Sequence, residues 1–279
     1  MLVVPQGRNH AVRVSRMRLQ TAERGRSMET PMYQQAPPPL SRNTDLRRYA
    51  RECLKGNWAI MIAAFVLMGI ITIAIMIPYY VATISTSILS VASGSSSDIT
   101  PAFTPLYFLS IVALYLVSPA LTIGSAMMCL RLIRARNADI SDLFKGFRII
   151  LKAFGAAFMV GLFTLLWSLL LFIPGIIAAY RYSQVFYILA DHPEMGIFDA
   201  IRLSKAMMAG AKFKLFCMQF SFIGWSLLSV LTLYIGMLWL VPYVSVSTSA
   251  FYEDVSRRYY FMTQPVQPQY NPNYTPNGY

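Results

Sequence analysis

Basic side chains are the residues in this sequence whose type and spacing best suit the binding of a ligand. The segment FDAIRLSKAMMAGAKFK, residues 198–214, contains Arg202, Lys205, Lys212 and Lys214 among apolar residues. A basic amphipathic segment can bind anionic lipid headgroups, and each basic group near a membrane surface contributes about 1 kcal/mol. The alternative is a block of charge that only fixes the orientation of the chain in a membrane. The sequence leaves both alternatives open.

A further basic residue, Arg181, lies at the end of a long apolar stretch. A charged side chain within a membrane costs about 2.5–3.5 kcal/mol on insertion scales, so it is a candidate for a ligand-binding or pathway residue. Alternatively, Arg181 extends from near the Pro174-Gly175 corner to the outer headgroups, with Tyr180 and Tyr182 as interface anchors. The two alternatives predict a cavity-facing and a headgroup-facing side chain.

The residues that catalysis or metal binding would need are not grouped in the sequence. Asp191, His192 and Glu194 are close together, but Pro193 lies between them and the segment has the composition of a loop at a helix end. The sequence contains no HExxH, Walker or GxSxG motif and no cluster of acidic residues within its apolar stretches. We therefore expect no catalytic residue, no cofactor, no metal site and no enzymatic activity.

Composition places the elements that carry these residues in a membrane. The chain has 279 residues, of which 56% are hydrophobic and 13% charged, whereas a soluble domain has about 25% charged residues. Between Lys55 and Arg131 the one charged residue is Asp98. The net charge of +12 arises from basic blocks that flank apolar runs, so it indicates membrane topology, and we expect no nucleic-acid partner.

The first half of the chain predicts two membrane-spanning helices. Residues 58–78 form an apolar run close to the roughly 20 residues that a 30 Å hydrocarbon core requires. Residues 79–105 are rich in Ser and Thr and contain two prolines, so they are expected to be a long outer loop. Residues 106–130 then form the second span.

Two longer uncharged tracts, residues 153–180 and 215–252, decide the number of spans. If each tract crossed once, the basic segment 181–214 would lie outside, against the preference of basic loops for the cytoplasm. If the tracts are hairpins that turn at 173–175 and around 236–242, every basic loop lies inside. We therefore predict an all-α transmembrane bundle with about six spans and both termini in the cytoplasm.

Amphipathic interfacial helices are expected before each pair of spans. Thr44 is a candidate cap for the first, which has Arg47, Arg48 and Arg51 on its polar face. Its apolar face has helical spacing and comprises Leu46, Tyr49, Ala50, Cys53 and Leu54. The second is expected to share an apolar face made of Leu143, Phe144, Phe147 and Leu151, and the third begins near Phe198. An interfacial helix, a span, a Pro or Gly break and a second span thus recur three times.

The ends of the chain differ from its middle. Residues 1–43 are polar and Arg-rich and predict a disordered arm, either a transit peptide or an extension upstream of a start at Met28 or Met32. Residues 44–255 are the membrane domain. Residues 256–279 are rich in Pro, Asn and Tyr and predict a disordered cytoplasmic tail.

Five motifs resemble the DUF975 family of uncharacterised bacterial membrane proteins. They are LKGNW (54–58), SDLFKGF (141–147), FIPGIIAAYRYS (172–183), AIRLSKAMMAG (200–210) and SFIGWSLLSVLTLYIGMLWLVPY (221–243). The resemblance covers about residues 44–255 and implies a bacterial plasma-membrane protein. The family is more distantly similar to the membrane domain of some glycerophosphodiester phosphodiesterases, which implies a lipid-related role. Neither resemblance supplies a catalytic residue.

The leading hypothesis is a non-enzymatic membrane scaffold that binds anionic lipids or partner proteins through its basic interfacial helices. The alternative is a small transporter or channel built from the helical hairpins, in which Arg181 or the Pro and Gly breaks face a cavity. The two hypotheses differ in whether Arg181 lines an internal polar path.

Overall fold

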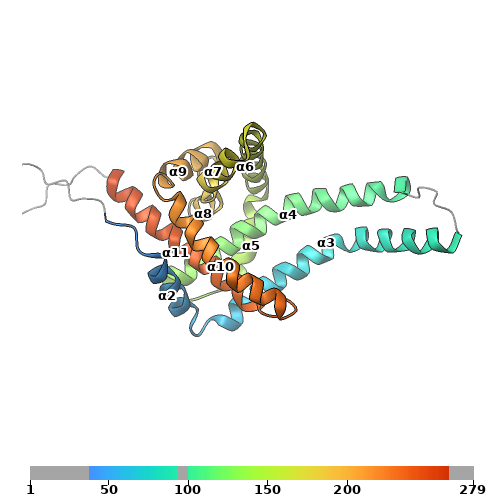
Figure 1. Ribbon diagram of the computed structural model, residues 1–279, viewed down its shortest axis with the longest axis horizontal. Helices are drawn as coiled ribbons and strands as arrows, with labels where there is room; N and C mark the ends of the chain where they lie inside the picture. The colour runs from blue at the N-terminus through green and yellow to red at the C-terminus, as the bar shows by residue number, and fades with distance from the viewer. Residues whose placement is uncertain (1–37, 94–99, 264–279) are drawn as a thin grey trace, which may run out of the picture. The chain divides into compact units, whose positions relative to one another are not determined.

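The chain folds into helices joined by short turns, as a computed structural model that describes residues 38–93 and 100–263 shows (Figure 1). Within these ranges there is no β-strand, so the predicted all-α class is confirmed. The helices are α2 (Asn43–Leu54), α3 (Trp58–Ser93), α4 (Thr100–Ala135), α5 (Ser141–Lys145), the 3₁₀ helix η1 (Gly146–Ile149), α6 (Ile150–Leu170), α7 (Phe172–Tyr182), α8 (Val185–Asp191), α9 (Ile197–Met207), α10 (Lys212–Leu231) and α11 (Met237–Thr263).

Four segments of the described chain are long and apolar enough to cross a membrane. They are Trp58–Ala92, Tyr107–Ala135, Ser141–Leu170 and Lys212–Leu231. Neither α7, with 11 residues, nor α11 is among them, so the predicted count of six spans stays a prediction. At about 1.5 Å per residue, α7 is about 16 Å long, roughly half the thickness of the hydrocarbon core.

The predicted outer loop at 79–105 is largely wrong. Helix α3 continues through Pro78 to Ser93, and α4 begins at Thr100; residues 94–99 lie outside the described part. The hydroxyl groups of Thr83, Ser85 and Ser87 donate hydrogen bonds to backbone carbonyls four residues earlier. Because these bonds satisfy polar side chains within a helix, a Ser/Thr-rich composition does not here indicate a loop.

The two predicted hairpins are present, with their turns slightly earlier than expected. Helix α6 ends before Leu171, whose extended backbone (φ −162°, ψ 144°) reverses the chain into α7. The turn from α10 to α11 includes Leu233 and Tyr234, which both have left-handed φ angles. In each hairpin a glycine near the start of the second helix lies against a serine seven residues earlier: Gly175, in α7, against Ser168, and Gly236, just before α11, against Ser229.

The first of the expected interfacial helices, α2, buries the predicted face. Leu46, Ala50, Cys53 and Leu54 are buried in α2, and Tyr49 is half-buried. The helix begins one residue before Thr44, which therefore does not cap it. The second predicted face is half right: Leu143 is buried and Phe147 is half-buried against the core, but Phe144 and Leu151 are exposed. The face is divided because the segment is a short α-helix followed by a 3₁₀ turn.

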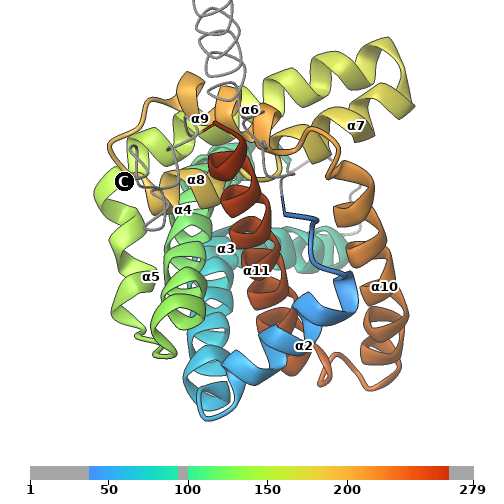
Figure 2. The same ribbon diagram turned by 90° about the vertical axis from the view of Figure 1, so that its left-hand side faces the viewer.

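The predicted threefold plan is visible in how the short helices pack. Helix α5 packs on α4, α9 packs on α7 and α8, and α2 packs on α11 (Figure 2). Helices α5 and α9 thus each contact the second half of the hairpin that precedes them, which we call its returning segment: α4 for the first hairpin, and α7 and α8 for the second. Helix α2, which has no hairpin before it, contacts α11, the returning segment of the last hairpin. Gly56 after α2 and Gly210 after α9 both adopt positive φ angles, of 85° and 77°, which glycine tolerates at a sharp turn.

The ends of the described chain extend the predicted domain slightly. Helix α11 continues to Thr263, so residues 256–263, predicted to begin the disordered tail, are helical. The predicted arm at residues 1–43 lies outside the described residues up to residue 37, and so does the tail from residue 264 onwards. The compact unit runs from Pro39 to Thr263.

Candidate functional site

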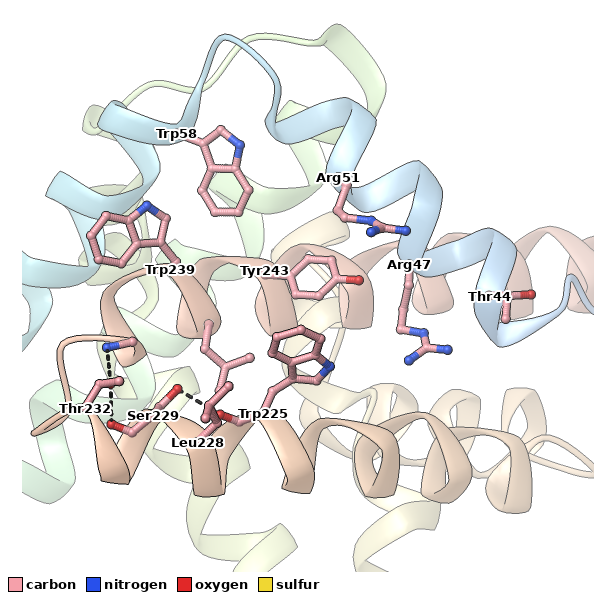
Figure 3. Close-up of a pocket in the computed structure, with 12 residues that line it drawn as sticks. Thr44, Arg47, Arg51, Trp58, Trp225, Leu228, Ser229, Thr232, Trp239 and Tyr243 are labelled. Atoms are coloured by element: carbon pink, nitrogen blue, oxygen red, sulfur yellow. Dashed lines mark hydrogen bonds between the residues drawn. The ribbon is translucent and has the colours of Figure 1, made fainter.

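A pocket of about 550 Å³ lies between α2, α10 and α11 (Figure 3). It joins α2 to the hairpin of α10 and α11, and these elements are far apart in the sequence. Its walls are mainly aromatic and aliphatic, and two arginines of α2 supply its positive charge. The lining residues are Thr44, Arg47, Arg51, Trp58, Trp225, Leu228, Ser229, Thr232, Gly236, Trp239, Leu240 and Tyr243.

Arg47 and Arg51 are four residues apart and therefore project from the same side of α2. The Arg47 guanidinium donates hydrogen bonds to the Ser221 hydroxyl on α10 and, at 3.3 Å, to the backbone carbonyl of Asn43. Arg51 is exposed. Figure 3 shows the Tyr243 hydroxyl pointing toward the side on which both guanidinium groups lie. Two cations and a phenol therefore converge at one end of the pocket.

Ser221 lies near the middle of α10, nine residues after Lys212 and ten before Leu231. At about 1.5 Å per residue, the contact with Arg47 is roughly 14 Å from the start of a helix long and apolar enough to cross a membrane. The sequence predicts Arg47 on the polar face of a helix at the interface. The tertiary contact instead places its charge beside the middle of α10.

The other end of the pocket is aromatic. Three of the four tryptophans in the chain, Trp58, Trp225 and Trp239, line it. Trp225 is 59% exposed and Trp239 is 51% exposed, so the pocket is open to the surroundings of the last hairpin. The Tyr243 ring meets Phe222 edge-on at a centroid distance of 5.4 Å, which fixes the ring in the pocket wall.

Hydroxyl groups follow the pocket toward the turn between α10 and α11. The Ser229 hydroxyl donates to the Trp225 carbonyl and the Thr232 hydroxyl to the Ser229 carbonyl, both at 2.9 Å. The Gly236 amide donates to the Thr232 hydroxyl oxygen at 3.2 Å (Figure 3). Polar groups therefore accompany the apolar wall from Ser221 to the end of the hairpin.

A second polar cluster joins the three returning helices. Arg134 on α4 donates to both carboxylate oxygens of Asp191 on α8, at 2.5 and 2.8 Å, and to Glu253 on α11. The Tyr252 hydroxyl also donates to Asp191, at 3.1 Å. Burial raises the pKa of Asp191, but the hydrogen bonds and charge of Arg134 outweigh it and hold that pKa below its usual value. The expected loop at 191–194 thus begins with a structural ion pair.

None of the five predicted binding residues lines the pocket. Arg181 lies nine residues after the start of α7, and the Ser204 hydroxyl of α9 donates to its backbone carbonyl at 2.9 Å. Arg181 is therefore at the α9 end of the hairpin, far along the helix from the Pro174 corner.

The remaining predicted residues lie on or beside α9. Arg202 and Lys205 are exposed on α9, and Arg202 pairs with Asp199 at 2.5 Å. Lys212 begins α10 and is half-exposed. Lys214 is different, because its ammonium pairs with Asp254 at 2.8 Å and its side chain is only 16% exposed. Lys214 therefore joins α10 to α11, whereas Arg202 and Lys205 form an exposed basic surface.

A protein-family profile matches most of the length of the chain. The profile of DUF975, described as a protein of unknown function, matches residues 40–179 and 168–259. The chain belongs to the DUF975 family. No curated protein and no solved structure matches it. The DUF975 match spans every helix that forms the pocket, from α2 to most of α11. Among the described residues, no three His, Cys, Asp or Glu side chains are grouped closely enough to hold a metal ion.

Proposed function

We propose that this protein is a non-enzymatic membrane protein that binds an anionic phospholipid in the pocket between α2, α10 and α11. The observation that carries the proposal is the pairing of Arg47 and Arg51 with three tryptophans in one pocket. A phospholipid has the same division, with a charged phosphate at one end and apolar chains at the other. We further propose a location in the bacterial plasma membrane with both termini in the cytoplasm.

The charged end of the pocket suits a phosphate. Arginine offers a planar set of N–H donors that matches phosphate oxygens, and each hydrogen bond to a charged group contributes about 1.5–3 kcal/mol. Arg47 is already held by Ser221 and Asn43, so part of the entropy cost of ordering it is met before a ligand binds. Arg51 and the Thr44 hydroxyl stand one turn on either side of Arg47 along α2 and also line the pocket.

The exposed basic surface of α9 supports the same function in a weaker way. Arg202 and Lys205 do not line the pocket, but both are exposed on α9, and Lys205 together with the Arg202–Asp199 pair leaves a net positive charge that attracts anionic headgroups. In this proposal the pocket selects one lipid, and α9 holds the protein against the anionic cytoplasmic leaflet. Partner proteins remain an alternative ligand for this surface.

The rival transporter or channel hypothesis places Arg181 or the Pro and Gly breaks against a cavity. Gly236, at the second break, lines the pocket, whereas Arg181 does not, and the Arg181 backbone carbonyl accepts a hydrogen bond from Ser204 of α9. The pocket itself supports lipid binding better than solute transport, because its walls are predominantly apolar and open beside Trp225 and Trp239.

A fluorescence titration of the full chain in detergent micelles tests the proposal. The titrants are two short-chain lipids with identical tails, dioctanoyl phosphatidylglycerol and dioctanoyl phosphatidylcholine, which differ in headgroup charge. Because Trp58, Trp225 and Trp239 line the pocket, its occupation changes their emission. We expect saturable binding of phosphatidylglycerol that is at least tenfold tighter than that of phosphatidylcholine, corresponding to about 1.4 kcal/mol.

Matched variants of α2 locate the site. Arg47→Gln and Arg51→Gln are each expected to weaken phosphatidylglycerol binding about tenfold, as loss of a charge-assisted hydrogen bond predicts. Arg48→Gln is the control, because Arg48 is on the same helix, is exposed and pairs with Glu52 outside the pocket. Equal affinity for the two lipids, or equal losses in all three variants, would contradict the proposal.

A further inference from the structure

From the hairpin of α3 and α4 we infer that the protein binds further copies of itself through an apolar face on the last part of α3. This face, which we call the α3 seam, consists of Val81, Ile84, Ile88 and Val91. None of the four residues lines the lipid pocket, so the inference is independent of the proposed function.

Helix α3 is longer than a membrane is thick. Its 36 residues extend about 54 Å, whereas the hydrocarbon core is about 30 Å thick and the bilayer with its headgroups about 40–45 Å. At the average tilt of membrane helices, about 20°, a helix of this length spans about 51 Å. Even at a tilt of about 40° it spans about 41 Å. One end of α3 therefore lies outside the hydrocarbon.

Charged and aromatic side chains identify that end. The exposed Lys55 places the start of α3 at one membrane surface, because a charged side chain in the hydrocarbon is costly. Tyr79 follows Trp58 by 21 residues, about 32 Å along the helix, and its ring lies 5.0 Å from that of Tyr107 on α4. Trp and Tyr gather at membrane interfaces, so these tyrosines mark the second surface. The α3 seam follows them, on the part of the hairpin that extends away from the other helices (Figure 1).

The α3 seam has the spacing of a coiled coil. Its residues succeed one another at steps of three, four and three, which is the pattern of the core positions in a heptad repeat. They are between 57% and 83% exposed, and Ile84, Ile88 and Val91 line an open groove of about 550 Å³. Burial of apolar surface stabilises by about 25 cal/mol per Å², so outside the hydrocarbon this face favours a partner helix.

The residues beside the seam favour another copy of the chain as that partner. Coiled coils that select a different chain use charged residues beside the core positions, but here these are Ser85, Ser87 and Ala92. No like charges therefore oppose self-association. Copies that insert into a membrane in one orientation also present α3 in parallel, so each seam residue meets its own counterpart in register.

The hydroxyl groups around the seam permit its burial. Thr83, Ser85 and Ser87 donate hydrogen bonds of 2.7–2.9 Å to backbone carbonyls of α3 itself. A partner helix that covers them therefore leaves no hydroxyl donor without an acceptor. Their small side chains also allow two helix backbones to approach closely.

Disulfide cross-linking of the full chain tests the inference. A single cysteine replaces Ile84 in a chain without Cys53, Cys129 and Cys217, and the protein is oxidised with copper phenanthroline in vesicles of phosphatidylcholine and phosphatidylglycerol. A large excess of lipid makes chance collisions rare. Because association holds the two thiols at a high effective concentration, we expect a linked dimer to form about tenfold faster than with Thr86→Cys. Thr86 is half-exposed on the opposite face of α3, and maleimide labelling checks that both thiols react.

A charge in the seam provides a second test. Val91→Lys, added to Ile84→Cys, places like charges of neighbouring copies against each other and is expected to slow cross-linking about tenfold. Thr86→Lys adds the same charge on the opposite face and should leave the rate unchanged. Equal rates for Ile84→Cys and Thr86→Cys, or a rate that Val91→Lys does not change, would overturn the inference. Phosphatidylglycerol binding in the micelle titration tests the lipid pocket separately, so either proposal can fail while the other stands.

Discussion

Arg134 and Asp191 join α4 to α8 through two parallel hydrogen bonds of 2.5 and 2.8 Å. The same guanidinium also reaches Glu253 on α11, so one arginine connects the returning segments of all three hairpins within the described residues. Arg134 is 47% exposed, whereas Asp191 and Glu253 are 15% and 22% exposed. Water therefore solvates the Arg134 guanidinium better than it solvates the two carboxylates, whose charges are compensated mainly by Arg134.

Replacement of Arg134 is expected to destabilise the fold. Arg134→Gln leaves two poorly solvated carboxylates without their cation, and we expect a loss of about 1–2 kcal/mol after discounting for the half-exposed guanidinium. The measurement is the free energy of unfolding in detergent. Arg148→Gln, at an exposed position on η1, is the control and is expected to change stability by less than about 0.5 kcal/mol. Equal stability of the two variants would show that the ion cluster contributes little.

Acid is expected to weaken the same contact. Because the pKa of Asp191 is lower in the folded chain than its usual value, its contribution to stability is complete above the unfolded pKa, about 3.9, and is lost as the pH falls through the folded pKa. The melting temperature should change little through Asp191 between about pH 7 and 5, and fall below about pH 4. Asp191→Asn should melt lower at neutral pH and fall less steeply in acid. A variant whose acid profile parallels the native one would contradict this assignment.

The close approach of α4 to α5 and η1 depends on two glycines. A Cβ atom at Gly124 would lie 1.9 Å from the Leu143 carbonyl oxygen, and one at Gly146 would lie 2.0 Å from that of Ala120. Because backbone atoms cannot move aside as a side chain can, Gly124→Ala is expected to cost about 2–3 kcal/mol. At Gly161 on α6 a Cβ meets nothing within 4 Å, so Gly161→Ala should stabilise by about 0.5–1 kcal/mol. Thermal unfolding of the two variants should move in opposite directions.

The number of spans is open to a labelling experiment in intact cells. Single cysteines replace Ile173, Ile235 or Ala209 in a chain without Cys53, Cys129 and Cys217, and a membrane-impermeant reagent labels them from outside. Ile173 and Ile235 are exposed at the two hairpin turns, and Ala209 is exposed in the basic turn before α10. Six spans predict labelling at both isoleucine positions and none at Ala209. Labelling of Ala209 from outside would leave four spans and remove the cytoplasmic surface proposed for α9.

The local sequence pattern predicts a feature well where the residues of one helix or one hairpin are enough to determine it. The buried face of α2 follows from the helical spacing of Leu46, Ala50 and Cys53, and the hairpins follow from charge placement and from the Pro and Gly breaks. The long outer loop was wrong because Thr83 and its neighbours satisfy their hydroxyls inside a helix. Composition alone cannot distinguish Ser and Thr hydroxyls that bond to the backbone of a helix from those exposed to solvent in a loop.

The pocket could not be predicted in the same way. Arg47 and Ser221 are 174 residues apart, and only the packing of α2 against the last hairpin brings them together. The sequence drew attention to Arg181, Lys212 and Lys214 because they interrupt or flank apolar runs, but Lys214 turns out to serve an ion pair with Asp254. The available signal was the pair of arginines four residues apart shortly before Trp58, which indicates an amphiphile site only once its partner helix is known.

The most direct test of the lipid-binding account is to find where a lipid lies on the protein. Phosphatidylglycerol with a photoreactive diazirine in one acyl chain is bound to the full chain in vesicles, irradiated, and the modified residues are identified by peptide mass spectrometry. The account predicts modification between Trp225 and Leu240, suppressed by excess phosphatidylglycerol and reduced in Arg47→Gln but not in Arg48→Gln. Modification that is spread evenly over the apolar helices, or confined to α9, would contradict it.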